Sequence, residues 1–283
     1  MEELYFENSK ECNNLIKKII DDRDIKQGKF FINTYLDSDK KYIQKGILKL
    51  EKFILLEQEE DLRLEKMYSM EKELFEKGYD CVIGIDEVGR GPFAGPVTVC
   101  GVVLPLEKKI RYVNDSKKLS KEVREKLDDE IRENSIDFVL YSMTNADIDE
   151  FGIKNCTLSC MEKCVMHIVQ KGYKNPFVLI DAERLKDIDI PQRSIIKGDT
   201  VSASIAAASI LAKNQRDRLM EKFHDLYSEY DFKSNVGYNS PKHFEGLLKY
   251  GICPIHRKGF VSSALYNKGI GKDEIGNKYN IEF

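Results

Sequence analysis

The segment Gly84-Ile-Asp-Glu-Val-Gly-Arg-Gly-Pro-Phe-Ala-Gly-Pro96 sets two adjacent acids at the end of an apolar run and follows them with a glycine-rich turn. The carboxylates of Asp86 and Glu87 repel phosphate, whereas Arg90 and the exposed N–H groups of the turn attract it. A site that contains both kinds of group usually holds a divalent metal ion between acid and phosphate. The segment therefore predicts a metal-dependent site for phosphodiester chemistry.

A dinucleotide-binding loop is the main alternative for this turn, and its spacing argues against it. Gly89, Gly91 and Gly95 follow the pattern G-x-G-x-x-x-G rather than G-x-G-x-x-G. The β-branched run after Gly95 predicts a strand, where a dinucleotide-binding unit needs a helix. The acids ahead of the turn would also repel a pyrophosphate.

Composition predicts a cytoplasmic globular protein with one full core and a smaller appendage. The chain has 283 residues, of which 42% are hydrophobic and 33% charged. Its longest apolar runs, near residues 97–106 and 205–212, fall short of the ~18 residues that a membrane span needs. The first residues lack the basic start and apolar stretch of a signal peptide. A net charge of −3 excludes a protein coated in positive charge but leaves room for a local nucleic-acid-binding patch.

Two groups of residues each allow a functional and a simpler interpretation. Cys156, Cys160 and Cys164 with His167 have the spacing of one helix face, which favours a buried stripe over a zinc site. Between residues 231 and 260, aromatic residues and histidines alternate with basic ones, which indicates either a phosphate-facing surface or an ordinary solvated face. The basic, aromatic and histidine residues in question are Lys233, Tyr238, Lys242, His243, Lys249, Tyr250, His256, Arg257 and Lys258.

Three parts of the chain are predicted from its patterns. Residues 1–76 form an N-terminal helical extension, since Ile43, Ile47, Leu50 and Ile54 lie at helical spacing. Residues 77–268 form an α/β catalytic domain, and residues 269–283 a C-terminal tail. Within the domain, strands are predicted over 81–86, 97–104, 136–143, 177–181 and 194–197. Helices are predicted over 120–133, starting at Ser120, and over 154–171 and 200–227. Another is predicted from Pro241, with Ser240 as its N-cap, to Gly251, which closes it.

Three apolar runs end in carboxylates: Asp86 with Glu87, then Asp181, then Asp199. Strand ends in α/β sheets are where ligand sites gather, although a single acid there is usually a cap or turn former, and Asp199 before a long helix fits that simpler role. If the acids converge, two charges ~4 Å apart repel by about 4 kcal/mol at a dielectric constant of about 20, so they must bind cations or protons. Oxygen ligands alone favour Mg²⁺ or Mn²⁺. Adjacent strand residues face opposite sides, so Asp86 and Glu87 share a site only if the strand breaks there, for which Gly89 is the expected cause.

Four motifs occur in order between about residues 79 and 265. They are Gly84–Pro96; Asp115-Ser-Lys-Lys-Leu-Ser120; Lys197-Gly-Asp-Thr-Val-Ser-Ala-Ser-Ile-Ala-Ala-Ala-Ser-Ile-Leu-Ala-Lys213 with Arg216-Asp-Arg-Leu-Met220; and Gly237-Tyr238 with Pro254-Ile-His-Arg257. Together they resemble ribonuclease HII, the bacterial type 2 ribonuclease H. The resemblance implies a ribonuclease H-like fold, a mixed sheet flanked by helices, here with an N-terminal helical extension.

The resemblance also implies an activity and the residues that perform it. The family cuts the RNA strand of RNA–DNA hybrids and nicks duplex DNA 5′ of embedded ribonucleotides by a two-metal-ion mechanism, leaving 3′-hydroxyl and 5′-phosphate ends. Its catalytic, metal-binding acids fall on Asp86, Glu87, Asp181 and Asp199, for Mn²⁺ or Mg²⁺. Its substrate-binding residues fall on Gly89, Arg90, Gly91 and the sensing tyrosine Tyr238. The expected partners are hybrids and ribonucleotide-containing duplexes, with no membrane and a monomeric chain.

Two places depart from the family pattern, and two alternatives remain open. Ala182 and Glu183 stand where glycine and asparagine are common, and Glu183 adds charge that opposes phosphate binding. Residues 235–239, Asn-Val-Gly-Tyr-Asn, replace the usual lysine-glycine-tyrosine-glycine-threonine, which affects how Tyr238 is positioned. The alternatives are the sister family ribonuclease HIII, disfavoured by the helical pattern before Tyr68 and by Asp199, and a non-catalytic nucleic-acid-binding module, disfavoured because all four acids are present.

Overall fold

The structure, a computed structural model, describes residue 6, residues 8–279 and residue 281. The chain divides into two compact units, Met1–Lys66 and Met67–Phe283. The first is helical and the second contains a five-stranded sheet. Among the described residues, no helix combines the length and the apolar character that crossing a bilayer requires.

Three helices build the first unit: α1 (Ser9–Asp21), α2 (Ile25–Tyr35) and α3 (Lys41–Met67), the last of which ends just past the unit. Asn8 and Asp24 cap α1 and α2 by accepting N–H bonds from the first turn of each helix. The apolar faces of the helices meet in one core, which includes Ile43, Ile47 and Leu50. This part of the chain is helical, as expected, and its compact unit ends at Lys66.

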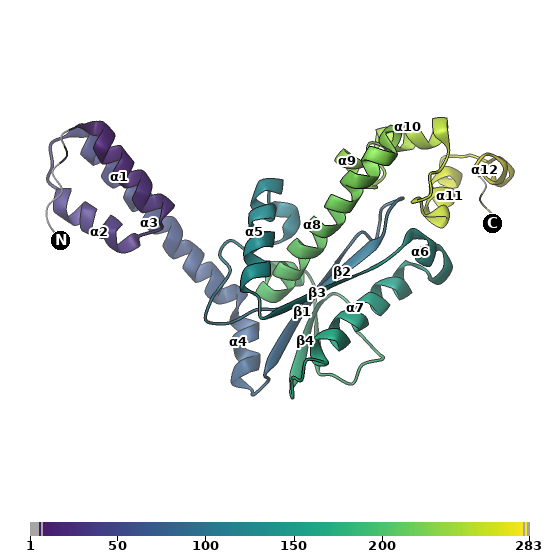
Figure 1. Cartoon of the computed structure of the whole chain (residues 1–283), viewed down its shortest axis with the longest axis horizontal. Coiled ribbons are helices and arrows are strands. Elements are labelled where there is room, and N and C mark those ends of the chain that lie inside the picture. The colour runs from purple at the N-terminus through teal and green to yellow at the C-terminus, as the bar shows by residue number, and fades with distance from the viewer. Residues whose placement is uncertain (1–5, 7, 280, 282–283) are drawn as a thin grey trace. The chain divides into compact units, whose positions relative to one another are not determined.

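The second unit is built on a mixed sheet with the strand order β3-β2-β1-β4-β5 (Figure 1). The strands are β1 (Cys81–Val88), β2 (Val97–Val103), β3 (Asp137–Met143), β4 (Pro176–Asp181) and β5 (Gln192–Ile195). β2 pairs antiparallel with β1 and β3, and β4 pairs parallel with β1 and β5. The predicted mixed α/β sheet flanked by helices is confirmed.

Two long helices, α7 (Ile153–Val169) and α8 (Ala203–Leu226), cover opposite faces of this sheet (Figure 1). Side chains of β1 alternate between them, as strand geometry requires. Ile83 packs in a core cluster with α7, and Val82 packs in another with α8. Gly84 lies so close to α8 that a Cβ atom there would overlap the backbone of Ser204. The even-numbered positions of β1, which include Asp86, therefore face α8.

Shorter elements complete the unit. They are α4 (Ser69–Glu76), α5 (Lys121–Asn134), α6 (Asn145–Phe151), α9 (Phe232–Asn235), α10 (Pro241–Tyr250), α11 (Lys258–Asn267) and α12 (Lys272–Tyr279), with 3₁₀ turns η1 (Ser116–Lys118), η2 (Gly198–Thr200) and η3 (Ser228–Tyr230). Ser240 caps α10 and Gly251 follows its end, as predicted. Ile275 and Tyr279 of α12 are buried in a core shared with the preceding helices, so α12 packs as part of this fold.

The cysteine stripe of α7 belongs to the core, as the simpler interpretation held. Cys156, Cys160 and Cys164 are all buried, the last two in the cluster between α7 and the sheet. The Nδ1 atom of His167 lies 3.3 Å from the hydroxyl of Tyr141. The cysteines therefore pack in the core, whereas His167 is exposed.

A buried acid on α4 accepts hydrogen bonds from the residues at the start of α8. Glu71 is 1% exposed, and its Oε1 accepts hydrogen bonds from the hydroxyls of Ser202 and Ser204, both at 2.6 Å, and from the N–H of Ser204 at 3.0 Å. A carboxylate at this end of a helix is stabilised by unpaired N–H groups and by the helix dipole. The helix before the sheet therefore supports the helix that covers it.

Candidate active site

Asp86 and Asp181 lie at the same edge of the sheet, at the carboxyl ends of two neighbouring parallel strands. β1 and β4 are paired so that Ile85 lies opposite Ile180, which sets the two aspartates level with each other. Leu179, two positions before Asp181, packs in the cluster on the α8 face. Because side chains alternate along a strand, Asp181 faces α8, as Asp86 does.

Asp199 reaches this edge from a turn before α8 rather than from a strand end. β5 ends earlier than predicted, and Lys197 has a left-handed φ of 56°. Asp199 then lies in η2, where the N–H of Gly198 donates to Oδ1 of Asp181 at 2.9 Å. The side-chain cap of α8 is Ser202. Asp199 is therefore not the helix cap that the simpler interpretation made of it.

The Asp86–Glu87 doublet lies inside β1, so the strand does not break between the two acids and their side chains leave it on opposite faces. The break comes after the strand, at Gly89, whose φ is 90°. The two acids accordingly take different partners. Asp86 forms a hydrogen bond with Ser209 on α8, and Glu87 Oε1 accepts one from Nη1 of Arg90 at 3.3 Å.

Burial and mutual repulsion raise the pKa values of three of the four acids. The pKa of Asp86 lies well above its usual value, chiefly through burial and then through the charges of Glu87 and Asp181. Burial also raises the pKa of Glu87. The pKa of Asp199 rises to about 6 through burial and then through the charges of Asp115 and Asp181. The charge of Asp181 thus acts on each of the other three acids. The four carboxyl groups form one electrostatic cluster.

The cluster suits hard divalent cations by its chemistry, although its side chains do not form a ready-made cage. Among the residues that the structure describes, no three His, Cys, Asp or Glu side chains are grouped so that they could hold a metal ion. Repulsion between carboxylates favours other partners, such as Arg90 for Glu87 and the N–H of Gly198 for Asp181. Glu87 Oε2, however, is buried and has no hydrogen-bond partner in the part of the chain that the structure describes, which is costly unless a cation or donor meets it. Carboxylate oxygens of this kind select Mg²⁺ or Mn²⁺.

The turn after β1 brings the predicted substrate-binding residues together. A Cβ atom on Gly89 would overlap Nε of Arg216, so only glycine fits this close approach. A Cβ atom on Gly91 would lie 3.7 Å from Cε1 of Tyr238. The tyrosine ring therefore stands beside the glycine-arginine-glycine turn, although the two are far apart in the sequence.

Arg90 is held by two acids, one of which is a departure from the family pattern. Its Nη1 donates to Glu183 Oε1 at 2.8 Å and to Glu87 Oε1 at 3.3 Å. Glu183 therefore forms the shorter of the two ion pairs. Ala182, just before it, has a φ of 53°, a conformation that costs alanine more than the glycine common there.

Tyr238 ends a tight turn organised by Asn235. Its side chain is 43% exposed and so is accessible to a ligand. Val236 and Gly237 have φ values of 45° and 88°. Asn235 Oδ1 accepts the N–H of Gly237 at 2.8 Å, and its Nδ2 donates to the carbonyl of Tyr230 at 2.7 Å. The altered loop sequence thus supplies its own means of positioning Tyr238.

A buried chain of histidines ends on the carbonyl of Tyr238. His243 Nδ1 lies 2.8 Å from that carbonyl, His243 Nε2 lies 2.9 Å from His256 Nε2, and His256 Nδ1 lies 2.8 Å from the backbone N of Cys253. Since a carbonyl only accepts, His243 donates from Nδ1, and its Nε2 accepts from His256. His256 Nδ1 then accepts the N–H of Cys253, so both rings are neutral. Burial lowers the pKa of His243, and burial with the charge of His243 lowers the pKa of His256 to about 3.

Arg216 and Arg257 are fully buried and donate only to backbone carbonyls. In the described part of the chain, neither forms an ion pair with a carboxylate. Arg216 donates to the carbonyls of Ala94, Pro96 and Val236, and Arg257 to those of Gly89, Arg90 and Gly95.

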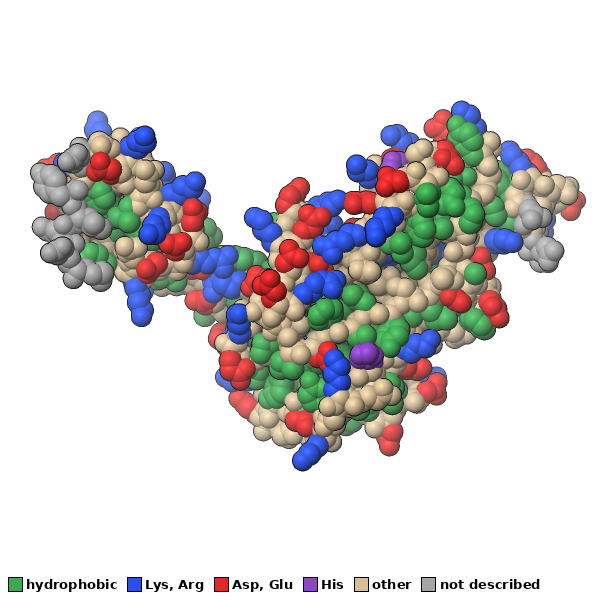
Figure 2. Space-filling model, viewed as in Figure 1, with side chains coloured by type: hydrophobic (Ala, Val, Ile, Leu, Met, Phe, Trp, Pro, Cys, Tyr) green, Lys and Arg blue, Asp and Glu red, His purple; other side chains and the backbone are tan. Residues whose placement is uncertain are grey.

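The segment 231–260 is therefore not the continuous phosphate-facing surface that was one of its two interpretations. Arg257, His243 and His256 are buried, and its lysines are the exposed cations. Lys and Arg side chains are interspersed with Asp and Glu over the face that Figure 2 shows. On this face the charges are mixed rather than gathered into one basic patch.

Three further residues surround the acids and were not predicted. Asp115 acts on Asp199 by its charge and by a side-chain hydrogen bond. Ser116 Oγ lies 2.9 Å from Oγ of Ser209, which in turn bonds Asp86. The only signal for them in the sequence was their presence in the quoted motifs.

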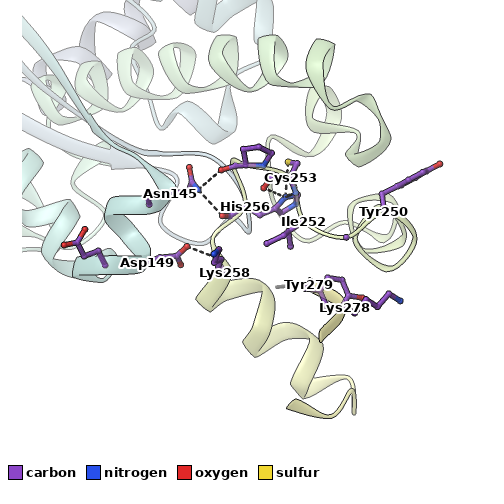
Figure 3. Close-up of a pocket in the computed structure, with 13 residues that line it drawn as sticks. Asn145, Asp149, Tyr250, Ile252, Cys253, His256, Lys258, Lys278 and Tyr279 are labelled. Atoms are coloured by element: carbon purple, nitrogen blue, oxygen red, sulfur yellow. Dashed lines mark hydrogen bonds between the residues drawn. The ribbon is translucent and has the colours of Figure 1, made fainter. Parts of the chain in front are cut away.

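A cavity of about 760 Å³ beside α6 contains none of the four acids (Figure 3). Asn145 Nδ2 donates across it to the carbonyls of Pro254 and His256, both at 3.0 Å. Asp149 accepts the N–H of Lys258 at 2.8 Å. These bonds fix the segment on either side of Arg257.

Comparisons with known proteins agree with this architecture. The family model described as Ribonuclease HII matches residues 83–263. A ribonuclease HII of Clostridioides difficile (strain 630) is 42% identical over 250 residues, which cover 88% of this chain and 97% of that protein. A ribonuclease HII of Caldanaerobacter subterraneus subsp. tengcongensis is 45% identical over 203 residues, 72% of this chain and 83% of that protein. The crystal structure of ribonuclease H2 from Pyrococcus horikoshii OT3 superposes with a TM-score of 0.53 at 28% identity, covering 63% of this chain and 93% of that one.

The fold is that of the ribonuclease H-like enzymes. Within that class, the chain belongs to the ribonuclease HII family, whose members cleave the RNA of RNA–DNA hybrids. The match decides between this family and its sister, ribonuclease HIII.

Proposed function

We propose that the chain hydrolyses the RNA strand of RNA–DNA hybrids and nicks duplex DNA 5′ of embedded ribonucleotides, leaving 3′-hydroxyl and 5′-phosphate ends. It would do so as a cytoplasmic monomer. The observation that carries the proposal is the register of β1 and β4, which sets Asp86 level with Asp181 on the α8 face, with the turn of Asp199 tied to Asp181. We assign these three acids and Glu87 as the catalytic residues that would hold Mn²⁺ or Mg²⁺.

The chemistry needs no covalent nucleophile from the protein. The divalent ions would supply an activated water for in-line attack and would stabilise the leaving 3′ oxygen. The carboxylates would provide the negative charge that holds them, and Glu87 would contribute an oxygen that meets no other partner among the described residues. The raised pKa of Asp86 follows from burial and crowding of like charge, and a cation in the cluster favours the ionised form again.

Selectivity requires groups that sense a 2′-hydroxyl, since this group distinguishes RNA from DNA sugar. Gly89, Arg90 and Gly91 would bind the ribose and its phosphate through backbone amides and the guanidinium. Tyr238 stands beside Gly91 with its ring exposed, where the ring would stack on the next deoxyribose while the hydroxyl reaches the 2′-oxygen.

The test is cleavage of a DNA duplex that carries one ribonucleotide, with Mn²⁺ or Mg²⁺ present. Asp86→Asn and Asp199→Asn are expected to lose nicking on the 5′ side of the ribonucleotide. Asp137→Asn is the matched control, because Asp137 is a buried acid at the start of β3 that pairs with Lys171. Unchanged cleavage by Asp86→Asn or Asp199→Asn would refute the metal roles. Binding without cleavage by the wild-type chain would favour the non-catalytic alternative.

The role of Tyr238 is tested on the same duplex. Tyr238→Ala is expected to lower kcat/KM for the single ribonucleotide by about tenfold or more, since stacking and one hydrogen bond are lost. Tyr238→Phe, which keeps the ring, is expected to lose less. A fall in melting temperature that parallels the fall in activity would instead assign Tyr238 to the fold.

A further inference from the structure

We infer that Arg257 is a positioning residue that fixes which way the backbone amides of the Gly89–Gly91 turn face. This rests on the proposed function, because it gives those amides to the ribose of the substrate. The Arg257 guanidinium lies beneath the turn and donates from Nη2 to Gly89 O at 2.6 Å and from Nη1 to Arg90 O at 3.0 Å. Its Nε donates to Gly95 O at 2.9 Å, so one side chain spans both ends of the turn.

The orientation of the amides follows from peptide geometry. The described peptide bonds are all trans, and in a trans peptide the C=O of one residue and the N–H of the next point in opposite directions. Because Gly89 O is held towards the buried guanidinium, the N–H of Arg90 points away from it. The same argument turns the N–H of Gly91 outward. Neither N–H has a hydrogen-bond partner among the described residues, and Gly91 is exposed.

Two adjacent outward N–H groups next to Tyr238 can donate to a sugar oxygen or a phosphate. The 2′-oxygen of a ribose accepts such a bond, whereas a deoxyribose offers no acceptor at that position. Arg257 would therefore act on specificity without touching the substrate.

The backbone of Arg257 is itself held on both sides. Its N–H donates to Phe93 O at 2.7 Å. Asn145 binds the carbonyls just before it, and Asp149 binds the N–H groups of Lys258 and Gly259 just after it (Figure 3). The guanidinium is thus carried by a rigid segment, which a positioning role requires.

A buried guanidinium without a carboxylate partner is costly, which argues that it serves a specific purpose. Burial and then the charge of Arg216 lower the pKa of Arg257 to about 9, so it stays protonated at neutral pH. A guanidinium presents five N–H donors in a fixed fork, whereas an ammonium is a single point. Lysine would keep the charge at this position and lose the fork.

The experiment measures discrimination in binding, in the Asp86→Asn background where cleavage is expected to be blocked. Two duplexes that differ by one ribonucleotide are compared by fluorescence anisotropy, and the ratio of their Kd values is recorded. Adding Arg257→Lys is expected to reduce that ratio by about tenfold, as the loss of two oriented hydrogen bonds implies. The Kd for the all-DNA duplex should change by no more than about twofold.

Val261→Ala is the matched control, because Val261 is fully buried on α11 near Arg257 and its aliphatic side chain forms none of the hydrogen bonds that hold the turn. It is expected to lower stability and leave the Kd ratio unchanged. Equal weakening of both duplexes by Arg257→Lys, or an unchanged ratio, would overturn the positioning role. A wild-type chain that neither cleaves nor discriminates would instead refute the proposed function.

A second measurement needs no variant and holds if Arg257→Lys fails to fold. In wild-type protein labelled with ¹⁵N, the amide signals of Arg90 and Gly91 are expected to shift more with the ribonucleotide duplex than with the all-DNA duplex. The guanidinium signals of Arg257 are expected to be separate, as for a side chain that cannot rotate. Averaged guanidinium signals, or identical shifts with both duplexes, would contradict the inference.

Discussion

Lowering the pH from about 7 to about 5.5 is expected to remove about 1.2 kcal/mol of folding stability through His256 alone. In the folded chain His256 is 2% exposed and its pKa is about 3, against an ordinary value of 6.5. Between these two values the unfolded chain binds a proton and the folded chain does not. Proton binding therefore stabilises the unfolded state, and the free energy of unfolding falls as the pH falls through the ordinary histidine pKa.

The hydrogen-bond chain explains why the pKa of His256 is low in the folded state. His256 Nδ1 already accepts the N–H of Cys253, and the lone pair of His243 Nε2 already accepts from His256. A proton on either atom would set two donors against each other. Since the chain ends on Tyr238 O, protonation would also disturb the loop of Tyr238.

The assay is urea unfolding followed by circular dichroism, at both pH values, for the wild type and for His256→Gln. The carboxyl groups with raised pKa values have the opposite effect, because they bind protons more tightly in the folded state. Their contribution to the unfolding free energy therefore rises as the pH falls. Subtracting the change in unfolding free energy measured for the variant cancels the contribution of the carboxyl groups. The glutamine side chain keeps a donor for His243 but does not titrate. The wild type should lose about 1.2 kcal/mol more than the variant. The same loss in both proteins, or a proton NMR titration of His256 near its ordinary pKa, would refute the reasoning.

Three further outcomes are expected from single substitutions. Glu183→Gln frees Arg90 from its shorter ion pair and should lower KM for a hybrid about two- to fivefold with kcat nearly unchanged; a higher KM at low salt would contradict this. Ala182→Gly removes a left-handed alanine and should raise the unfolding free energy in urea by about 1 kcal/mol, whereas a loss would show that the φ of 53° carries no cost. Gly84→Ala forces a Cβ atom into the backbone of Ser204 and should cost about 3 kcal/mol or more, and near-wild-type stability would disprove the close approach of β1 and α8.

The elements that local pattern specifies were predictable from the sequence. The caps at Ser120 and Ser240 lie where predicted, because a serine before a helical run accepts N–H bonds from within its own first turn. β1 and β4 were predictable since apolar, β-branched runs suit a sheet buried on both faces. The end of β5 was not, because Lys197 adopts a left-handed turn that no local residue demands.

The acids of the candidate site could be predicted from the sequence, but the buried residues that hold its loops could not. Asp86 and Asp181 were found because an acid ending an apolar run is a visible pattern. Arg257 and His243 were placed on a surface, since basic residues are usually exposed. Their partners are backbone carbonyls, which every residue has and which therefore leave no mark in a sequence.

The carboxylate of Glu71 has a practical consequence for anyone who shortens this chain. A fragment beginning at residue 77, the boundary that the sequence suggested, would lack the one acceptor shared by two serine hydroxyls and an amide at the head of α8. Those donors, which are buried in the full chain, would lose this partner a few residues after the turn that carries Asp199. A minimal enzyme should therefore start no later than Met67, where the second unit begins.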